Sequence, residues 1–232
     1  MRFVYPEGAT PIGDISDLKP VWVKTQEDLN QVEAENIANA MDKYVIKPVP
    51  SQHDWFTVAF LQKIHREMFG EVWGWAGYFR KTGTISGVAP YRIRSDLESL
   101  CGEVSFWEKE GAELTILERA ARVHHQLVWI HPFPNGNGRF ARLITDRYLK
   151  TWKSPILRWP RDLGNDGIHR KRYIGALKSG DGGDLAPLIA FMGDFGARDP
   201  SLGALSNNGL AKGICLELLE KALQRPESKT FA

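Results

Sequence analysis

Two apolar stretches of helical spacing, residues 116–130 and 140–152, are separated by a short segment rich in Gly and Asn. This segment reads His131-Pro132-Phe133-Pro134-Asn135-Gly136-Asn137-Gly138-Arg139, and it constrains the chain more than any other feature. A Gly- and Asn-rich turn that opens an apolar helix directs backbone N–H groups and the positive end of the helix dipole at one spot. Such a spot binds phosphate, so the segment favours a helix–loop–helix unit that handles a nucleoside triphosphate.

Basic side chains flank this turn. Arg139 and Arg142 are three residues apart and therefore share a face of the second helix, where both can clamp phosphates with bidentate hydrogen bonds. His131 ends the first apolar stretch, and a neutral imidazole there can take a proton from an attacking hydroxyl. The alternative is a structural turn, with His131 in the core and both arginines in solvent. Convergence of a base, an anion site and two guanidiniums favours the catalytic interpretation.

The same segment resembles the signature of the Fic family, in which HPF is followed by any residue, an acidic residue, GNGR, two residues and Arg. Eight of the nine specified positions match, and the departure is Asn135, where the family usually carries Asp or Glu. The resemblance extends over residues 20–195 and is closest to the subgroup called mobile mystery protein B, found near mobile elements. Further similar positions are residues 75–80 (WAGYFR), before the family's docking hairpin, and Arg170, Tyr173, Ala176 and Leu177 in its closing helix.

The resemblance implies a mainly α-helical Fic fold with a small β-hairpin flap. It also implies transfer of AMP from the co-substrate ATP to a Ser, Thr or Tyr hydroxyl of a target protein. His131 would be the general base, and Phe133 would be buried and fix the loop. Oriented amides and arginines suit phosphoryl chemistry, which needs mainly positioning and charge stabilisation. The nucleotide would be held by an anion hole at Gly136, Asn137 and Gly138, with Asn137 also at the α-phosphate, by Arg139 at the β-phosphate and by Arg142 at the γ-phosphate.

Asn135 stands where the family's acidic residue holds the metal ion. Hard divalent cations such as Mg²⁺ prefer carboxylate and water oxygens to a neutral amide. We therefore expect Asn135 to hold Mg²⁺ or Mn²⁺ more weakly, directly or through water, with lower activity, altered metal choice or a different transferred group. The alternative is a turn residue without a metal role, since Asn favours such turns.

Glu35 and Asn36 resemble the second half of the family's inhibitory helix motif, which reads Ser or Thr, three residues, Glu, then Gly or Asn. Gln31 occupies the Ser or Thr position, so the match is partial. The resemblance implies that Glu35 pairs with Arg142 and blocks the γ-phosphate, because a triphosphate would have to displace a charge-assisted pair. The alternative is a solvated or capping Glu35.

Residues 80–94 predict a short hairpin, because glycines and β-branched residues suit two strands and a turn. In the family this flap pairs with an extended segment of the target and holds the acceptor hydroxyl near the base. A purely structural hairpin is the alternative. The docking residues would be Thr82, Gly83, Thr84, Ile85, Ser86 and Gly87.

Helical periodicity dominates the rest of the chain after residue 20. Together with the family resemblance, it predicts three regions: an N-terminal arm (1–20), a domain that resembles the Fic family (21–200) and a C-terminal helical extension (201–232). His65, His124 and His125 fall in helical stretches and are interpreted as structural, since adjacent helical histidines point in different directions and a third metal ligand is missing. Residues 153–167 are predicted to be a loop. The predicted helices span 26–44, 54–69, 97–110, 116–130, 140–152, 169–177, 185–195 and 210–223.

Composition limits the classes of function. The 232 residues are 43% hydrophobic with eight tryptophans, enough apolar area for one helical domain. Cys101 and Cys215 lack metal or disulfide spacing, which indicates a reducing compartment. The sequence shows neither a leader nor a membrane-length apolar run, so we expect a cytoplasmic protein. A net charge of +2 makes a nucleic-acid partner unexpected.

Two alternatives to adenylyl transfer stay open. One is transfer of another nucleotide part or of phosphate, because the anion site does not dictate which group moves. The other is a catalytically silent nucleotide- or partner-binding module. In it, metal binding is lost because Asn135 replaces the acidic residue, and Glu35 keeps the site closed. The sequence also leaves open whether an antitoxin chain accompanies this one.

Overall fold

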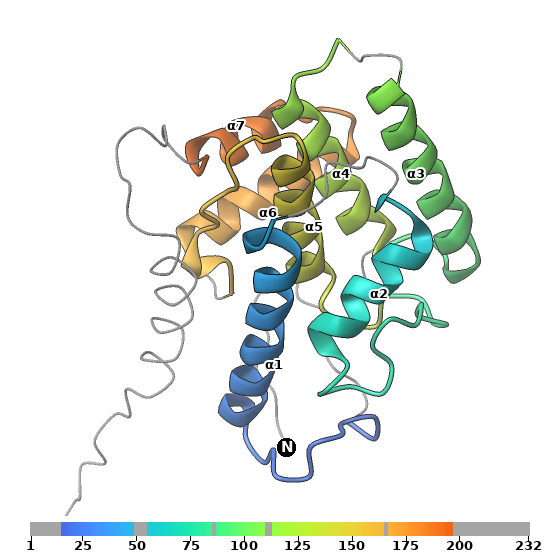
Figure 1. Cartoon of the computed structure of the whole chain (residues 1–232), viewed down its shortest axis with the longest axis vertical. Helices are drawn as coiled ribbons and strands as arrows, with labels where there is room; N and C mark the ends of the chain where they lie inside the picture. Colours follow the sequence, from blue (N-terminus) through green and yellow to red (C-terminus); the bar gives the residue numbers. More distant parts are fainter. Residues whose placement is uncertain (1–14, 49–54, 85–86, 110–112, 165–166, 197–232) are drawn as a thin grey trace, which may run out of the picture.

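The computed structural model describes residues 15–48, 55–84, 87–109, 113–164 and 167–196, and in these residues the chain is mainly α-helical (Figure 1). The predicted mainly α-helical fold class is therefore confirmed. The helices are α1 (Gln26–Met41), the π-helix η1 (Asp42–Ile46), α2 (Val58–Phe69), the 3₁₀-helix η3 (Pro90–Arg92), α3 (Ile93–Lys109), α4 (Ile116–Ile130), α5 (Asn137–Thr151), the 3₁₀-helix η4 (Arg161–Gly164), α6 (Ile168–Asp181) and α7 (Ala186–Asp194).

Local capping fixes several helix starts. Thr25 and Thr115 each form a capping box, in which the threonine side chain accepts from the third backbone N–H and an acidic side chain at that position bonds back. Thr57 caps α2 in the simpler way, by accepting from the N–H of Phe60. These contacts explain why α4 begins where the sequence predicted it to begin.

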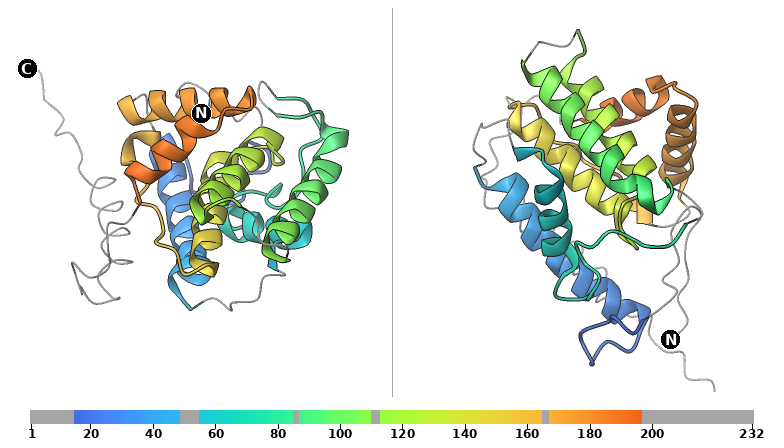
Figure 2. Two further views of the ribbon diagram at one scale, coloured as in Figure 1. Left: turned by 90° about the horizontal axis from the view of Figure 1, so that it is seen from above. Right: turned by 90° about the vertical axis from the view of Figure 1, so that its right-hand side faces the viewer.

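The pair α4 and α5 forms the centre of the bundle. α4 contacts α3, α5, α6 and α7, and α5 also contacts α2 and η1. In the right-hand view of Figure 2, α1 and α2 lie on one side of this pair, and α6 and α7 lie on the other. Because the two central helices are packed on both sides, the loop that joins them is held at a fixed place.

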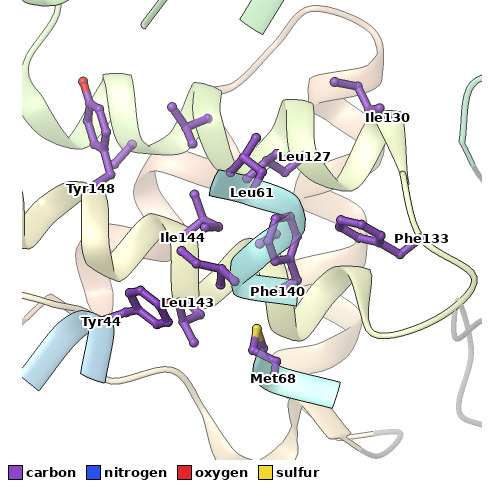
Figure 3. Close-up of a cluster of buried hydrophobic side chains, with 14 of the residues drawn as sticks. Tyr44, Leu61, Met68, Leu127, Ile130, Phe133, Phe140, Leu143, Ile144 and Tyr148 are labelled. Carbon is purple, nitrogen blue, oxygen red and sulfur yellow. The ribbon is translucent and has the colours of Figure 1, made fainter. Parts of the chain in front are cut away.

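Apolar side chains from α2, α4 and α5 interdigitate beneath this loop (Figure 3). Each is at most 2% exposed, so the core reaches up to the loop itself. Burying such side chains contributes roughly 1.5–3 kcal/mol each. The labelled members from these helices and the loop are Leu61, Met68, Leu127, Ile130, Phe133, Phe140, Leu143, Ile144 and Tyr148.

The predicted flap differs from the structure. Residues 80–84 and 87–89 contain no paired strands, and Ile85 and Ser86 lie outside the described residues. Arg80 explains the difference, because its guanidinium bonds to the carbonyls of Thr82 and Val88, which a hairpin ladder would otherwise use.

The domain boundaries stay a prediction. Most of the N-terminal arm and all of residues 201–232 lie outside the described residues, including the predicted final helix. Leu18, at the end of the arm, forms an isolated antiparallel bridge with Trp73. Across the described segments, the helices are too short or too polar to cross a membrane.

Candidate active site

His131 closes α4 and begins the loop. Its backbone is left-handed (φ 52°, ψ 60°), and its N–H still donates to the Leu127 carbonyl at 3.2 Å. A left-handed residue at a helix C-terminus turns the chain sharply, and non-glycine residues adopt it at some cost. The structure thus places the predicted base at the bend, with the side chain largely buried.

The His131 ring is a neutral acceptor at pH 7. Burial lowers its pKa to about 4, an effect that the charge of Arg80 reinforces and a hydrogen bond to Val128 opposes. Nδ1 lies 3.4 Å from the Val128 carbonyl oxygen, which can only accept, so Nδ1 carries the proton. Nε2 is then the ring nitrogen with a lone pair, as a general base requires.

Gly136 begins α5 in the left-handed region, at φ +78°. A Cβ on this residue would lie 2.6 Å from two ring atoms of Phe69, so the site needs a glycine for both conformation and space. Asn137, Gly138 and Arg139 follow as the first turn of α5, where backbone N–H groups lack intrahelical acceptors. The sequence predicts the anion site at this turn, and its role stays a prediction.

Gly136→Ala is expected to destabilise the fold by about 2–4 kcal/mol, because it adds a strained φ to a clash with a buried ring. Gly138→Ala is the matched control: a Cβ there meets only the Arg142 Nη1 atom, at 3.7 Å. In a helix this control is expected to be neutral or stabilising by up to about 1 kcal/mol. Urea unfolding monitored by circular dichroism measures both, and equal losses would contradict the packing argument.

The side chain of Asn137 is hydrogen-bonded to the loop backbone in this structure. It is 2% exposed, its Oδ1 accepts from the Phe133 N–H at 2.9 Å, and its Nδ2 donates to the Phe133 carbonyl at 2.8 Å. Both ends of the amide are therefore engaged with the loop backbone. Asn137 thus closes the loop, and its role at the phosphates stays a prediction.

His65, which the sequence predicts to be structural, contacts the catalytic loop. It is fully buried and stacks on Phe133, with ring centroids 3.7 Å apart. Its Nδ1 accepts from the Gly77 N–H at 3.0 Å, so Nε2 carries the proton and donates to the Asn135 carbonyl at 3.1 Å. One imidazole thus connects α2, the segment before the flap and the loop.

Arg139 is paired with a glutamate of α1. Its Nη1 lies 2.6 Å from Oε2 of Glu33, which is 4% exposed, and its guanidinium lies over the Phe69 ring at 4.9 Å. The other Glu33 oxygen accepts from the Trp73 indole N–H at 2.7 Å. The Glu33 carboxylate is therefore bonded to the Arg139 guanidinium, which is predicted to bind the β-phosphate.

The expected pairing of Glu35 with Arg142 does not occur in this structure. Glu35 is exposed and accepts from Gln31 Nε2 at 3.3 Å. It lies two residues beyond Glu33, about 200° around the helix, so only one of the two can face the core. That periodicity is also the signal that could have found Glu33, since Leu29 and Ala40 share its buried face.

Arg142 is held by a buried polar chain. Its guanidinium interacts electrostatically with the Tyr173 hydroxyl, which donates to His124 Nε2 at 2.8 Å. His124 Nδ1 donates to the Thr145 hydroxyl at 2.9 Å, and that hydroxyl donates to the Ala141 carbonyl at 2.7 Å. The structural role expected for His124 is consistent with this chain, which fixes the predicted γ-phosphate arginine through α6.

Asn135 does not offer a ready cation site. Its Oδ1 accepts from the Gly136 N–H at 2.7 Å and from Arg139 Nη2 at 3.4 Å. A divalent cation would compete with these donors and would face a guanidinium. Among the residues that the structure describes, moreover, His, Cys, Asp and Glu form no cluster of three or more that could hold a metal. The side chains present therefore do not fit a protein-held Mg²⁺ in this arrangement.

Comparison with known proteins finds a matching family model and similar sequences. Residues 55–149 match the model of the Fic/DOC family. The Protein adenylyltransferase Fic of Aedes aegypti is 28% identical over 181 residues, which cover 77% of this chain and 35% of that protein. The chain thus spans about a third of the length of this curated relative.

Solved structures share the fold. The N-terminal Fic domain of a cell filamentation protein from Bartonella quintana is 19% identical with a TM-score of 0.62, covering 85% of this chain and 95% of that one. BepC from Bartonella tribocorum, solved with bound AMPPNP, is 20% identical with a TM-score of 0.58 and covers 84% and 96%. At these identities the likeness concerns the fold.

Proposed function

We propose that this chain is a Fic-type protein adenylyltransferase, moving AMP from ATP to a Ser, Thr or Tyr hydroxyl of a target protein, because residues 55–149 match the Fic/DOC family model. One arrangement carries the proposal: a short loop with a buried histidine at one end and a helix N-terminus with two arginines at the other. The name of the Aedes aegypti relative and the AMPPNP bound to BepC support the same activity.

His131 is the general base in this proposal. The acceptor hydroxyl oxygen attacks the α-phosphorus of ATP and its proton passes to Nε2 of His131. The bond from the α-phosphorus to the bridging oxygen breaks, and pyrophosphate leaves. The low pKa of His131 keeps the ring neutral at neutral pH, so the lone pair is present before each turnover.

The N-terminus of α5 and the two arginines stabilise the phosphates. Backbone N–H groups of the first helical turn supply oriented dipoles, while Arg139 and Arg142 supply charge at the β- and γ-phosphates. The chain from Arg142 through Tyr173 to His124 keeps its guanidinium in place before nucleotide arrives. No step of this mechanism is assigned to a metal ion.

Glu33 restrains the site in this proposal, in the role that sequence resemblance gave to Glu35. A triphosphate that uses Arg139 has to displace a charge-assisted pair of 2.6 Å. The displaced Glu33 then retains its bond to Trp73 but loses its cation. Nucleotide affinity therefore depends on how readily this pair opens.

A catalytically silent nucleotide- or partner-binding module is the second candidate. Two observations favour it: Glu33 occupies Arg139, and Asn135 supplies an amide where a carboxylate would bind the metal. Transfer of phosphate or of another nucleotide part is a third outcome that the same assay separates.

His131→Ala is expected to lower AMP transfer by roughly 10²- to 10⁴-fold and to leave ATP affinity within about twofold, because the base is needed only for chemistry. The assay incubates the protein and a cell lysate with ATP labelled at the α- or the γ-phosphate, in Mg²⁺ or Mn²⁺. Intact-mass spectrometry follows modification of the chain itself. His169→Ala, with a side chain 43% exposed, is the matched control.

Label from the α-phosphate that depends on His131 supports adenylyl transfer, and its metal dependence shows what Asn135 still permits. Label from only the γ-phosphate indicates kinase chemistry. ATP binding without any transfer favours the silent module. Membership of the mobile mystery protein B subgroup, an antitoxin partner and a cytoplasmic location stay predictions from sequence.

A further inference from the structure

Arg80 is a buried cation whose partners are all neutral backbone oxygens. The residue is 4% exposed. Its Nε donates to the His131 carbonyl at 2.6 Å, its Nη1 to the Thr82 carbonyl at 2.9 Å, and its Nη2 to the carbonyls of Val88 and Ile130. Burying a guanidinium is costly unless its donors are satisfied, and these acceptors engage four of its five N–H groups.

The four acceptors belong to two groups that are distant in sequence. Ile130 and His131 are the end of α4 and the catalytic bend. Thr82 and Val88 are the two limbs of the segment predicted to dock the target. The backbone N–H of Arg80 adds a fifth contact to the catalytic loop, donating to the Pro132 carbonyl at 3.0 Å.

Gly87 shows that the two groups lie in direct contact. Its backbone has φ +116°, and a Cβ on it would lie 2.6 Å from the His131 Cβ and 2.8 Å from Arg80 Nη2. The second limb of the flap thus packs against the base without room for a side chain. Arg80 and this contact therefore connect both limbs to His131.

We propose that Arg80 is a positioning residue that fixes the register between the target-docking limbs and the general base. This inference rests on the proposed function for its catalytic meaning. Arg80 acts through the carbonyls on both sides and touches neither nucleotide nor target. Arg80 holds both the docking limbs and the catalytic bend. A docked target segment therefore presents its hydroxyl to His131 in a single position.

The test compares Arg80→Lys and Arg80→Gln with Arg92→Lys, a control whose side chain is 57% exposed. Lysine keeps the charge but cannot reach four carbonyls in different directions. With ATP saturating, both Arg80 variants are expected to lose roughly hundredfold in kcat and to raise KM for the target, whereas the dissociation constant of AMPPNP stays within about twofold. A parallel loss of kcat and AMPPNP affinity would mean general misfolding and would overturn the proposal.

Amide hydrogen exchange tests the register without relying on activity. In Arg80→Lys, exchange is expected to rise together in peptides covering Thr82, Val88 and His131, and to stay unchanged at the start of α5. Gly87→Ala disturbs the same contact from the second limb and is expected to give the same exchange pattern. It serves as the test if the Arg80 variants fold poorly. Unchanged exchange at His131 in both variants overturns the proposal. If the variants show this raised exchange but the wild-type protein has no transfer activity, the register is supported and only the proposed function is rejected.

Discussion

Glu33→Gln is expected to tighten ATP binding by roughly tenfold to a hundredfold. The introduced amide keeps an oxygen for the Trp73 indole N–H but presents no negative charge to Arg139. Arg139 then meets the phosphate without first breaking a charge-assisted bond, which is worth about 1.5–3 kcal/mol. Isothermal titration with AMPPNP measures the affinity without turnover, and the adenylyl transfer rate at subsaturating ATP should rise in parallel.

Glu35→Gln is the matched control for this prediction. It removes the same charge from the same helix, but Glu35 is exposed and contacts Gln31. Its affinity for AMPPNP is expected to equal that of the wild type. Equal tightening in both variants would reveal a general charge effect, and tightening in Glu35→Gln alone would restore the assignment that the sequence motif suggested.

The helical framework was predictable because the signals are local. The apolar period and the capping box at Thr115 and Glu118 set α4, and the turn with Gly136 sets the start of α5. Only glycine fits at Gly136, where a positive φ and the Phe69 ring coincide. These features need no knowledge of the rest of the chain, so sequence reasoning located the loop correctly.

The contacts of the site were less predictable because they are long-range. A motif comparison selected Glu35, whereas the helical period places Glu33 on the buried face with Leu29. The fold then decides that this face meets Arg139, which is 106 positions away. A local pattern can specify which side of a helix is buried, but it cannot specify which cation that side will meet.

Two further contacts of this kind share the cause. The residues around Thr82 have a composition typical of a hairpin, yet the Arg80 guanidinium takes the carbonyls that strands would pair. Asn137 has the residue type and position of a phosphate ligand, yet its amide satisfies both backbone groups of Phe133. In each case a buried polar group has to be satisfied, and this requirement overrides the local tendency.

Stability is expected to fall steeply on mild acidification, because three buried histidines resist protonation. Burial lowers the pKa of His65 and His124 to about 3 and that of His131 to about 4, against 6.5 in the unfolded chain. Below pH 6.5 the unfolded chain therefore binds protons that the folded chain does not, and stability is lost as pH falls toward 4. Each such proton costs about 1.4 kcal/mol per pH unit.

Asp146 has the opposite effect on how folding stability changes with pH. Burial raises its pKa to about 7, although bonds from the Leu157 N–H and the Trp159 indole oppose this. The folded state then binds a proton that the unfolded state lacks between pH 7 and 4, which offsets one histidine. The net expectation is a loss of about 2–3 kcal/mol per pH unit between pH 6 and 5.

Urea unfolding at pH 7, 6 and 5 measures this loss of unfolding free energy per pH unit. The variant His124→Gln tests whether the buried histidines cause it. That variant removes one proton-resistant imidazole, so its slope is expected to be smaller by about 1.4 kcal/mol per pH unit, whatever stability it loses at pH 7. His169→Gln, at a residue whose side chain is 43% exposed, should keep the wild-type slope. A wild-type stability that is flat from pH 7 to 5 would mean that the buried rings accept protons in the folded state. The neutral His131 assumed for catalysis would then have to be abandoned as well.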